Sequence, residues 1–190
     1  MKRVIICGAG SSLQEGISLD LWNRIKNEEI WSCNSIFKIM PYLPSKEFWV
    51  DIDFIDNNYE ELDKLYTQGV ELISKKFTNR KKYMNLQNQE RFTQYDTTRE
   101  NDKYFGNKAL EHNLIYYGMT GLCGTFALSV AIARGYEEIY LLGFDFGNTS
   151  LTENVTHVYT REQMEKLRIH CTGAFRPSVY RLPDNTVRRE

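Results

Sequence analysis

The sequence has little that would mark a membrane, secreted or zinc-binding protein. Its four cysteines, Cys7, Cys33, Cys123 and Cys171, stand far apart and form no C-x-x-C pair, the spacing that many zinc and redox sites use. No apolar run approaches the length of a membrane span, and nothing before Cys7 resembles a secretory signal. We therefore expect free buried thiols and a cytoplasmic protein.

An excess of charge of one sign is also lacking. The chain of 190 residues has 24 Lys and Arg against 25 Asp and Glu, which leaves a formal net charge of −1. This balance gives no global field that would attract nucleic acid, so a nucleic-acid partner is not expected. The length favours a single domain over residues 1–190, and the apolar fraction of 42% is sufficient for one core.

What the sequence does contain is an alternation of strand and helix patterns. Short apolar runs that end in small or polar residues predict strands at 1–7, 29–34 and 47–53. Between the first two runs, apolar residues recur every fourth position from Leu13 to Ile25. This period predicts one amphipathic helix or a pair of short helical turns.

The second half repeats the alternation. Residues 125–134 predict an apolar helix, Gly135 its left-handed stop, and residues 136–142 the strongest strand of the chain. A short helix at 160–170 and a last strand at 178–182 complete the pattern. We expect an α/β fold with a Rossmann-like, mostly parallel sheet, helices on both faces and functional loops at the carboxyl ends of the strands.

A polar segment at about 74–113 interrupts this pattern. Its apolar residues show no sustained period, so we expect a lid-like insertion that supplies little core. Its basic cluster, which begins at Lys75, indicates either a solvated surface or contact with RNA or a phosphorylated ligand.

The turn that follows the first strand has two possible interpretations. Gly8-Ala9-Gly10-Ser11-Ser12 lies between a strand and a helix, where glycines let the backbone approach a phosphate and a helix N-terminus offers free N–H groups. The third glycine of G-x-G-x-x-G is replaced by Leu13, so the dinucleotide fingerprint is incomplete. The turn alone therefore indicates either a nucleotide site or an ordinary connection.

Three further residues, at two places in the chain, could take part in chemistry. Asp51 and Asp53 lie at the end of the third expected strand, where residues i and i+2 share a face and could bind one divalent cation. Solvated acids at a strand end are the alternative. His157 follows the strongest strand and is the best placed histidine for a general base, although a lone histidine in such a loop is more often structural than catalytic.

Three blocks together resemble a known family. They are "VIICGAGSSL", "WSCN" and "GTFALSVAIARGYEEIYLLGFDF". Their order resembles the bacterial sialyltransferases, which carry G-N-G-P-S-L after a first strand, a strand ending in C-N, and a glycine-led helix before GY-x-EIYL-x-G-x-DF. The blocks are also similar to the related 6-hydroxymethyldihydropterin pyrophosphokinase-like proteins, which share this nucleotide-binding core.

The resemblance implies a nucleotide site built from residues of all three blocks and from Asp51. The implied nucleotide-binding residues are Gly8, Ala9, Gly10, Ser11, Ser12, Asn34, Asp51, Gly124, Thr125 and Asp145. It also implies that His157 is the base that deprotonates the acceptor hydroxyl. In the sialyltransferases an asparagine stands at the position of Ala9, and a tyrosine follows the motif that ends here at Phe146.

These features predict a nucleotide-dependent transferase, in the first place a small sialyltransferase-like glycosyltransferase that needs no metal. The alternatives are a magnesium-dependent pyrophosphokinase for a pterin-like alcohol, with Asp51 and Asp53 as metal ligands, and a nucleotide-sensing protein without turnover. The expected partners are a nucleotide or nucleotide-sugar and a small or glycan acceptor. A symmetric homo-oligomer remains open.

Overall fold

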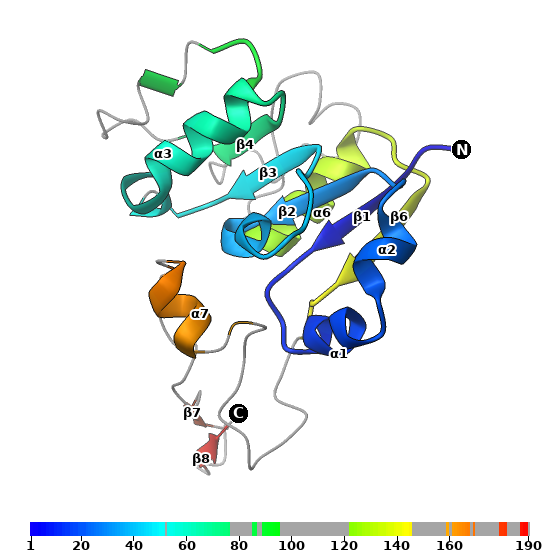
Figure 1. The fold of residues 1–190 in the computed structure, drawn as a ribbon, viewed down its shortest axis with the longest axis vertical. Helices are drawn as coiled ribbons and strands as arrows, with labels where there is room; N and C mark the ends of the chain where they lie inside the picture. The colour runs from blue at the N-terminus through cyan, green and yellow to red at the C-terminus, as the bar shows by residue number, and fades with distance from the viewer. Residues whose placement is uncertain are drawn as a thin grey trace.

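The computed structural model describes residues 1–51, 53–76, 85–86, 89–95, 122–145, 159, 161–167, 169, 179–181 and 187–189. Its main element is a six-stranded sheet with the order β5-β4-β3-β2-β1-β6 (Figure 1). Every neighbouring pair in this sheet is parallel. The expected α/β fold with a parallel sheet is therefore confirmed.

The six strands are short, and the apolar residues of the first five in chain order are largely buried. They are β1 (Arg3–Cys7), β2 (Ile30–Cys33), β3 (Lys46–Trp49), β4 (Glu71–Lys75), β5 (Phe92–Tyr95) and β6 (Glu138–Leu142). The strands expected at 1–7, 29–34 and 136–142 are confirmed within one or two residues at each end.

The third expected strand ends earlier than its sequence indicated. β3 stops at Trp49, and Asp53 is already the first residue of the helix α3 (Asp53–Thr67). The carboxylate of Asp51 accepts a hydrogen bond of 3.1 Å from the backbone N–H of Asp53, a local contact that turns the chain out of the extended conformation. The prediction that Asp51 and Asp53 share one face of a strand is therefore wrong.

The helices connect consecutive strands. They are α1 (Ser12–Ser18), α2 (Leu21–Ile25), the 3₁₀ helix η1 (Asn34–Lys38), α3, α6 (Cys123–Ala133) and α7 (Arg161–Lys166). The period of four between β1 and β2 thus corresponds to a pair of short helices. Asp20, in the left-handed conformation with φ of 63°, separates them.

Both faces of the sheet carry helices. On one face, Ile6 of β1 and Phe48 of β3 pack against Phe126 and Val130 of α6. On the other face, side chains of β1 and β2 pack against α1 and α2, and side chains of β3 and β4 pack against α3. Figure 1 shows α6 behind the sheet and α2 in front of it. The expected helices on both faces are confirmed.

The polar segment 74–113 contains part of the sheet. β4 ends inside it, and β5 forms the outer strand of the main sheet on that side. Phe92 and Tyr95 of β5 are buried in the two cores on either face. The expectation that the segment supplies little core is wrong at β5, while residues 77–84, 87–88 and 96–113 lie outside the described residues.

The expected last strand is present but belongs to a separate hairpin. β7 (Val179–Arg181) pairs with β8 (Val187–Arg189) in an antiparallel two-stranded sheet. In the part of the chain that the structure describes, none of the helices combines the length and apolarity needed to cross a bilayer.

A charged cluster joins α6 to the amino ends of the strands. The Arg134 guanidinium donates two hydrogen bonds to the Glu71 carboxylate at 3.0 and 2.7 Å, and Lys46 Nζ lies 3.1 Å from the same group. Although burial acts to raise it, the hydrogen bonds and charge of Arg134 lower the pKa of Glu71 to about 2. This cluster holds the end of α6 at the edge of the sheet formed by the amino ends of the strands.

Candidate functional site

The strand order reverses between β1 and β6. From β1 the chain adds β2, β3, β4 and β5 on one side, and β6 then pairs with the other side of β1. In open parallel sheets the crevice for ligands lies at the carboxyl ends of the strands at such a switch point. Here that place is formed by the turn 8–12 after β1 and the turn 143–145 after β6.

The two turns are in direct backbone contact. The N–H of Gly8 donates to the Leu142 carbonyl at 2.8 Å, and the N–H of Gly10 donates to the Gly143 carbonyl at 2.7 Å. A Cβ atom on Gly8 or Gly10 would lie 2.7 or 2.6 Å from the Gly143 oxygen, and Gly143 itself has a φ of 67°. The glycines are thus required for the close approach of the two turns.

The side chain of Asp145 stabilises this contact through hydrogen bonds. Its carboxylate accepts the backbone N–H of Ser12 at 2.6 Å, the hydroxyl of Ser11 at 3.1 Å and, at a short distance, the hydroxyl of Ser12. An internal carboxylate therefore occupies the start of α1, where one of the two interpretations of the sequence places a phosphate. The N–H groups of Gly8, Gly10 and Ser12 all donate to acceptors of the protein itself.

Phe144 links this pair of turns to the start of α6. Its ring is the nearest group to a Cβ built on Gly124, and it lies 3.1 Å from one built on Gly8. The hydroxyl of Thr125 donates to the Leu122 carbonyl at 2.9 Å within the first turn of α6. The structure thus brings Gly124 next to the two turns through an aromatic side chain that sequence reasoning missed.

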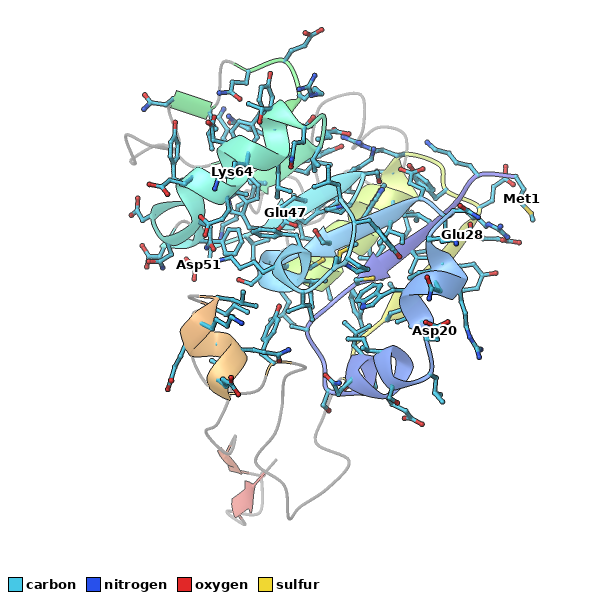
Figure 2. All side chains as sticks on the ribbon, viewed as in Figure 1. Met1, Asp20, Glu28, Glu47, Asp51 and Lys64 are labelled. Carbon is cyan, nitrogen blue, oxygen red and sulfur yellow. The ribbon has the colours of Figure 1, made fainter. Side chains whose placement is uncertain are left out.

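The remaining predicted residues lie along the same edge. Asn34 directly follows β2 with a φ of 57°, and Asp51 follows β3 (Figure 2). Because parallel strands stand about 4.8 Å apart, Asp51 follows a strand roughly 10 Å from β1. That separation is compatible with a ligand lying across several strand ends.

His157, the predicted general base, lies outside the described residues. Its role therefore remains a prediction. Within the described ranges no three His, Cys, Asp or Glu side chains gather closely enough to hold a metal ion by themselves.

A buried carboxyl group lies behind this edge. Glu47 of β3 is fully buried and accepts a short hydrogen bond from the Ser32 hydroxyl, while its Oε1 atom has no hydrogen-bond partner among the described residues. Burial raises the pKa of Glu47 well above its ordinary value, and the Ser32 hydrogen bond and the Lys38 charge offset this only in part. Burial thus favours the protonated form of Glu47, an effect that sequence patterning gave no means to foresee.

Lys38 joins three elements near this acid. Its Nζ atom donates to the Leu167 carbonyl at 3.0 Å, just after α7, and lies 3.5 Å from the Glu61 carboxylate of α3. The Lys38 side chain is only 5% exposed. The end of α7 is therefore held next to η1 and α3 through the Lys38 side chain.

Comparisons with known proteins place this architecture in a family. No curated protein sequence matches the chain. Among solved structures, the MAf glycosyltransferase from Magnetospirillum magneticum AMB-1 is similar at 18% identity and a TM-score of 0.48, over 83% of this chain and 25% of that one. The chain therefore spans about a quarter of the length of that enzyme.

A family model described as "6-hydroxymethylpterin diphosphokinase MptE-like" matches residues 1–151. This range includes the sheet, both turns at the switch point, Asn34 and Asp51. The expected resemblance to pterin pyrophosphokinase-like proteins is thereby confirmed, and the chain belongs to the 6-hydroxymethylpterin diphosphokinase MptE-like family.

Proposed function

We propose that this protein is a nucleotide-dependent transferase that transfers a diphosphoryl group from ATP to a pterin-like alcohol. The observation that supports this most directly is that the family match over residues 1–151 contains the whole described carboxyl edge of the sheet. The nucleotide would lie across the ends of β6, β1, β2 and β3, at the switch point.

The reaction balances with one nucleotide and one alcohol. The hydroxyl oxygen of the acceptor attacks the β-phosphorus of ATP, the bond between that phosphorus and the bridging oxygen to the α-phosphate breaks, and AMP leaves. The hydroxyl proton passes to a base. His157 is our candidate for that base, on the strength of its position after the strongest strand.

Magnesium is the metal that such a reaction implies, and the site contains carboxylates, the type of side chain that binds this ion. Mg²⁺ is usually held by one or two carboxylates together with substrate phosphates and water. Asp51 and Asp53 are exposed at the carboxyl edge, and one oxygen of Asp51 is engaged by the Asp53 N–H. These two residues would hold the ion with the phosphates, and it would neutralise charge that develops on them.

The residues of this chain would contribute to the reaction by orienting the bound nucleotide. The glycines bring two turns together without side chains between them, and Asp145 fixes the turn after β1 by three hydrogen bonds. Because Asp145 already occupies the start of α1, we assign the phosphates to the positions of Asn34 and of Gly124 with Thr125. The turn 8–12 then shapes the site rather than holding the phosphate.

Glycosyl transfer from a nucleotide-activated sugar is the second candidate. It is favoured by the block that resembles sialyltransferases, which forms α6, β6 and the turn that ends at Asp145. In that reaction His157 would deprotonate an acceptor hydroxyl for attack on the anomeric carbon, and no metal would be needed.

Ligand-dependent melting followed by product analysis separates the candidates. The purified chain is heated with CMP, UDP, ADP or ATP, each with and without Mg²⁺; a ligand at about one hundred times its Kd stabilises by roughly 2.7 kcal/mol. Diphosphoryl transfer predicts a shift with ATP and Mg²⁺, and release of AMP that depends on a hydroxymethylpterin. Asp51→Asn should remove the Mg²⁺ dependence, whereas Asp63→Asn on exposed α3 should not.

Other outcomes would redirect the proposal. A metal-independent shift with CMP would favour glycosyl transfer, and a shift without any product would indicate a sensing protein. If no nucleotide stabilises the chain, the proposed nucleotide site is wrong.

A further inference from the structure

The helix α3 is interrupted at Asn58. The backbone of this residue has a φ of −132° and a ψ of 19°, which divides α3 into residues 53–57 and residues 59–67. Proline and glycine, the usual causes of a sharp kink, are both absent from α3. The side-chain amide of Asn58 instead donates to the Phe54 carbonyl at 2.8 Å, the acceptor that the backbone N–H of residue 58 has in an unbroken helix.

Asn58 is an unfavourable residue for the position that it occupies. It is only 3% exposed, and its Oδ1 atom has no hydrogen-bond partner among the described residues. A buried polar atom without a partner lowers stability, and asparagine favours a helix less than alanine does. Residues that break local rules in this way are expected where function requires a particular geometry.

The two parts of α3 are attached to different strands. In the first part, the ring of Phe54 stacks on Trp49, the last residue of β3, with 6.0 Å between the ring centroids, and the Phe54 N–H donates to the Asp51 carbonyl at 3.2 Å. The second part ends just before β4, where the N–H of Val70 donates to the Leu65 carbonyl at 3.0 Å. The break therefore lets the first part follow the end of β3 while the second part follows β4.

The proposed magnesium ligands lie at the start of the first part. The Asp51 carboxylate accepts the Asp53 N–H at 3.1 Å, so the two residues form one local unit with the first turn of α3. We infer that Asn58 is a positioning residue, whose break in α3 sets the orientation of Asp51 and Asp53 toward the ion. In an unbroken α3 the first turn would follow the axis of residues 59–67. This inference rests on the proposed function, because it takes these two carboxylates as ligands of Mg²⁺ bound with ATP.

The test compares Asn58→Ala with Asn57→Ala. Asn57 is the exposed neighbour in the same helix, so the control makes the same change without removing the break. Each protein is titrated with Mg²⁺ at a fixed ATP concentration, and ATP binding is followed by calorimetry. We expect Asn58→Ala to need roughly tenfold more Mg²⁺ for half-maximal ATP binding, the low end of the effect that residues supporting metal ligands usually have. Asn57→Ala should match the wild type.

The urea midpoint of each variant distinguishes positioning from a role in stability. Asn58→Ala should keep or exceed the wild-type midpoint, because alanine favours a continuous helix and leaves no buried oxygen without a partner. A lower midpoint together with an unchanged Mg²⁺ requirement would overturn the inference and leave the proposed function in place. A wild-type protein that binds ATP without Mg²⁺, or binds no ATP, would overturn both.

Hydrogen exchange of the wild type decides the question even if Asn58→Ala does not fold. Because the first turn is separated from the rest of α3, ATP with Mg²⁺ should slow amide exchange in residues 53–57 and leave residues 59–67 unchanged. Equal slowing of both parts, or slowing of residues 59–67 alone, would show that α3 responds as one helix and would contradict the role of Asn58.

Discussion

The carboxylate of Asp145 accepts the backbone N–H of Ser12 at 2.6 Å, which joins the end of β6 to the start of α1 across 133 positions of sequence. A carboxylate at a helix N-terminus is stabilised by the unpaired N–H groups and by the helix dipole. In this fold the same contact holds the two turns of the switch point together. Asp145 is thus a structural anion at the place where nucleotide-binding folds often bind a phosphate.

Replacing Asp145 should weaken this junction. Asp145→Asn keeps one acceptor oxygen but loses the charge and presents an amide N–H₂ to the Ser12 hydroxyl. Because hydrogen bonds to charged groups contribute about 1.5–3 kcal/mol, we expect a loss of roughly 1–2 kcal/mol in the free energy of unfolding. Urea denaturation measures it.

Asp63→Asn is the matched control, since Asp63 is exposed on α3 and far from either turn in sequence. The control should change stability by less than about 0.5 kcal/mol. Equal free energies of unfolding for Asp145→Asn and the wild type would mean that the three hydrogen bonds of the Asp145 carboxylate contribute little to stability.

Adding one methyl group between the two turns should lower the free energy of unfolding more than the Asp145→Asn change does. In Gly10→Ala the new Cβ would lie 2.6 Å from the Gly143 carbonyl oxygen and 2.7 Å from Cγ of Asp145. The backbone must shift to relieve such contacts, so we expect a loss of about 1–3 kcal/mol, measured by urea denaturation.

Gly16→Ala is the companion variant, because Gly16 lies inside α1 and a Cβ there first meets the flexible end of Leu21 at 3.1 Å. Alanine favours a helix over glycine by roughly 1 kcal/mol, so this change should be neutral or stabilising. If both variants lose the same stability, the close approach of the two turns is not the cause.

Sequence patterns predicted the elements whose signal is local. β1, β2 and β6 are apolar runs closed by glycine or a polar residue, and α6 is an apolar run that begins and ends near glycines. β5 was missed because four residues of a strand inside a polar segment give too short an alternation. The capping contact of Asp51 that shortens β3 also has no periodic signal.

The candidate site was predictable in its parts but not in its contacts. The glycine turn and Asp145 could each be selected from sequence, since both follow predicted strands. Their hydrogen bonds depend on β6 pairing with β1, a long-range arrangement that no local pattern encodes. For the same reason the position of Phe144 between Gly8 and Gly124 could not be foreseen.

The Glu71–Arg134 pair should make stability fall in acid. The folded pKa of Glu71 is about 2 against an ordinary value of 4.5, so its contribution is complete above pH 4.5 and is lost as the pH falls toward 2. At 1.36 kcal/mol per pKa unit this contribution amounts to at most about 3.4 kcal/mol.

Glu71→Gln should therefore lower the free energy of unfolding at pH 7 and approach the wild type near pH 2–3, as measured by urea denaturation across this range. Glu60→Gln, an exposed residue of α3, controls for the loss of one acid. A constant difference between Glu71→Gln and the wild type at every pH would contradict the assigned role of the ion pair.

Glu47 should produce a pH dependence of the opposite sign. Its folded pKa is raised well above 4.5 by burial, so the unfolded chain loses this proton before the folded chain does. The contribution of Glu47 to the stability of the fold is then complete below about pH 4.5 and is lost as the pH rises toward its folded pKa.

Glu47→Gln keeps the size of the side chain, can still hydrogen-bond to the Ser32 hydroxyl and does not titrate. Its stability relative to the wild type should therefore rise with pH above 4.5, by up to about 1.4 kcal/mol per pH unit. Urea denaturation of both proteins at pH 4.5, 6 and 7.5 measures this trend, and a difference that stays constant over the three values would mean that Glu47 is already ionised in the folded core.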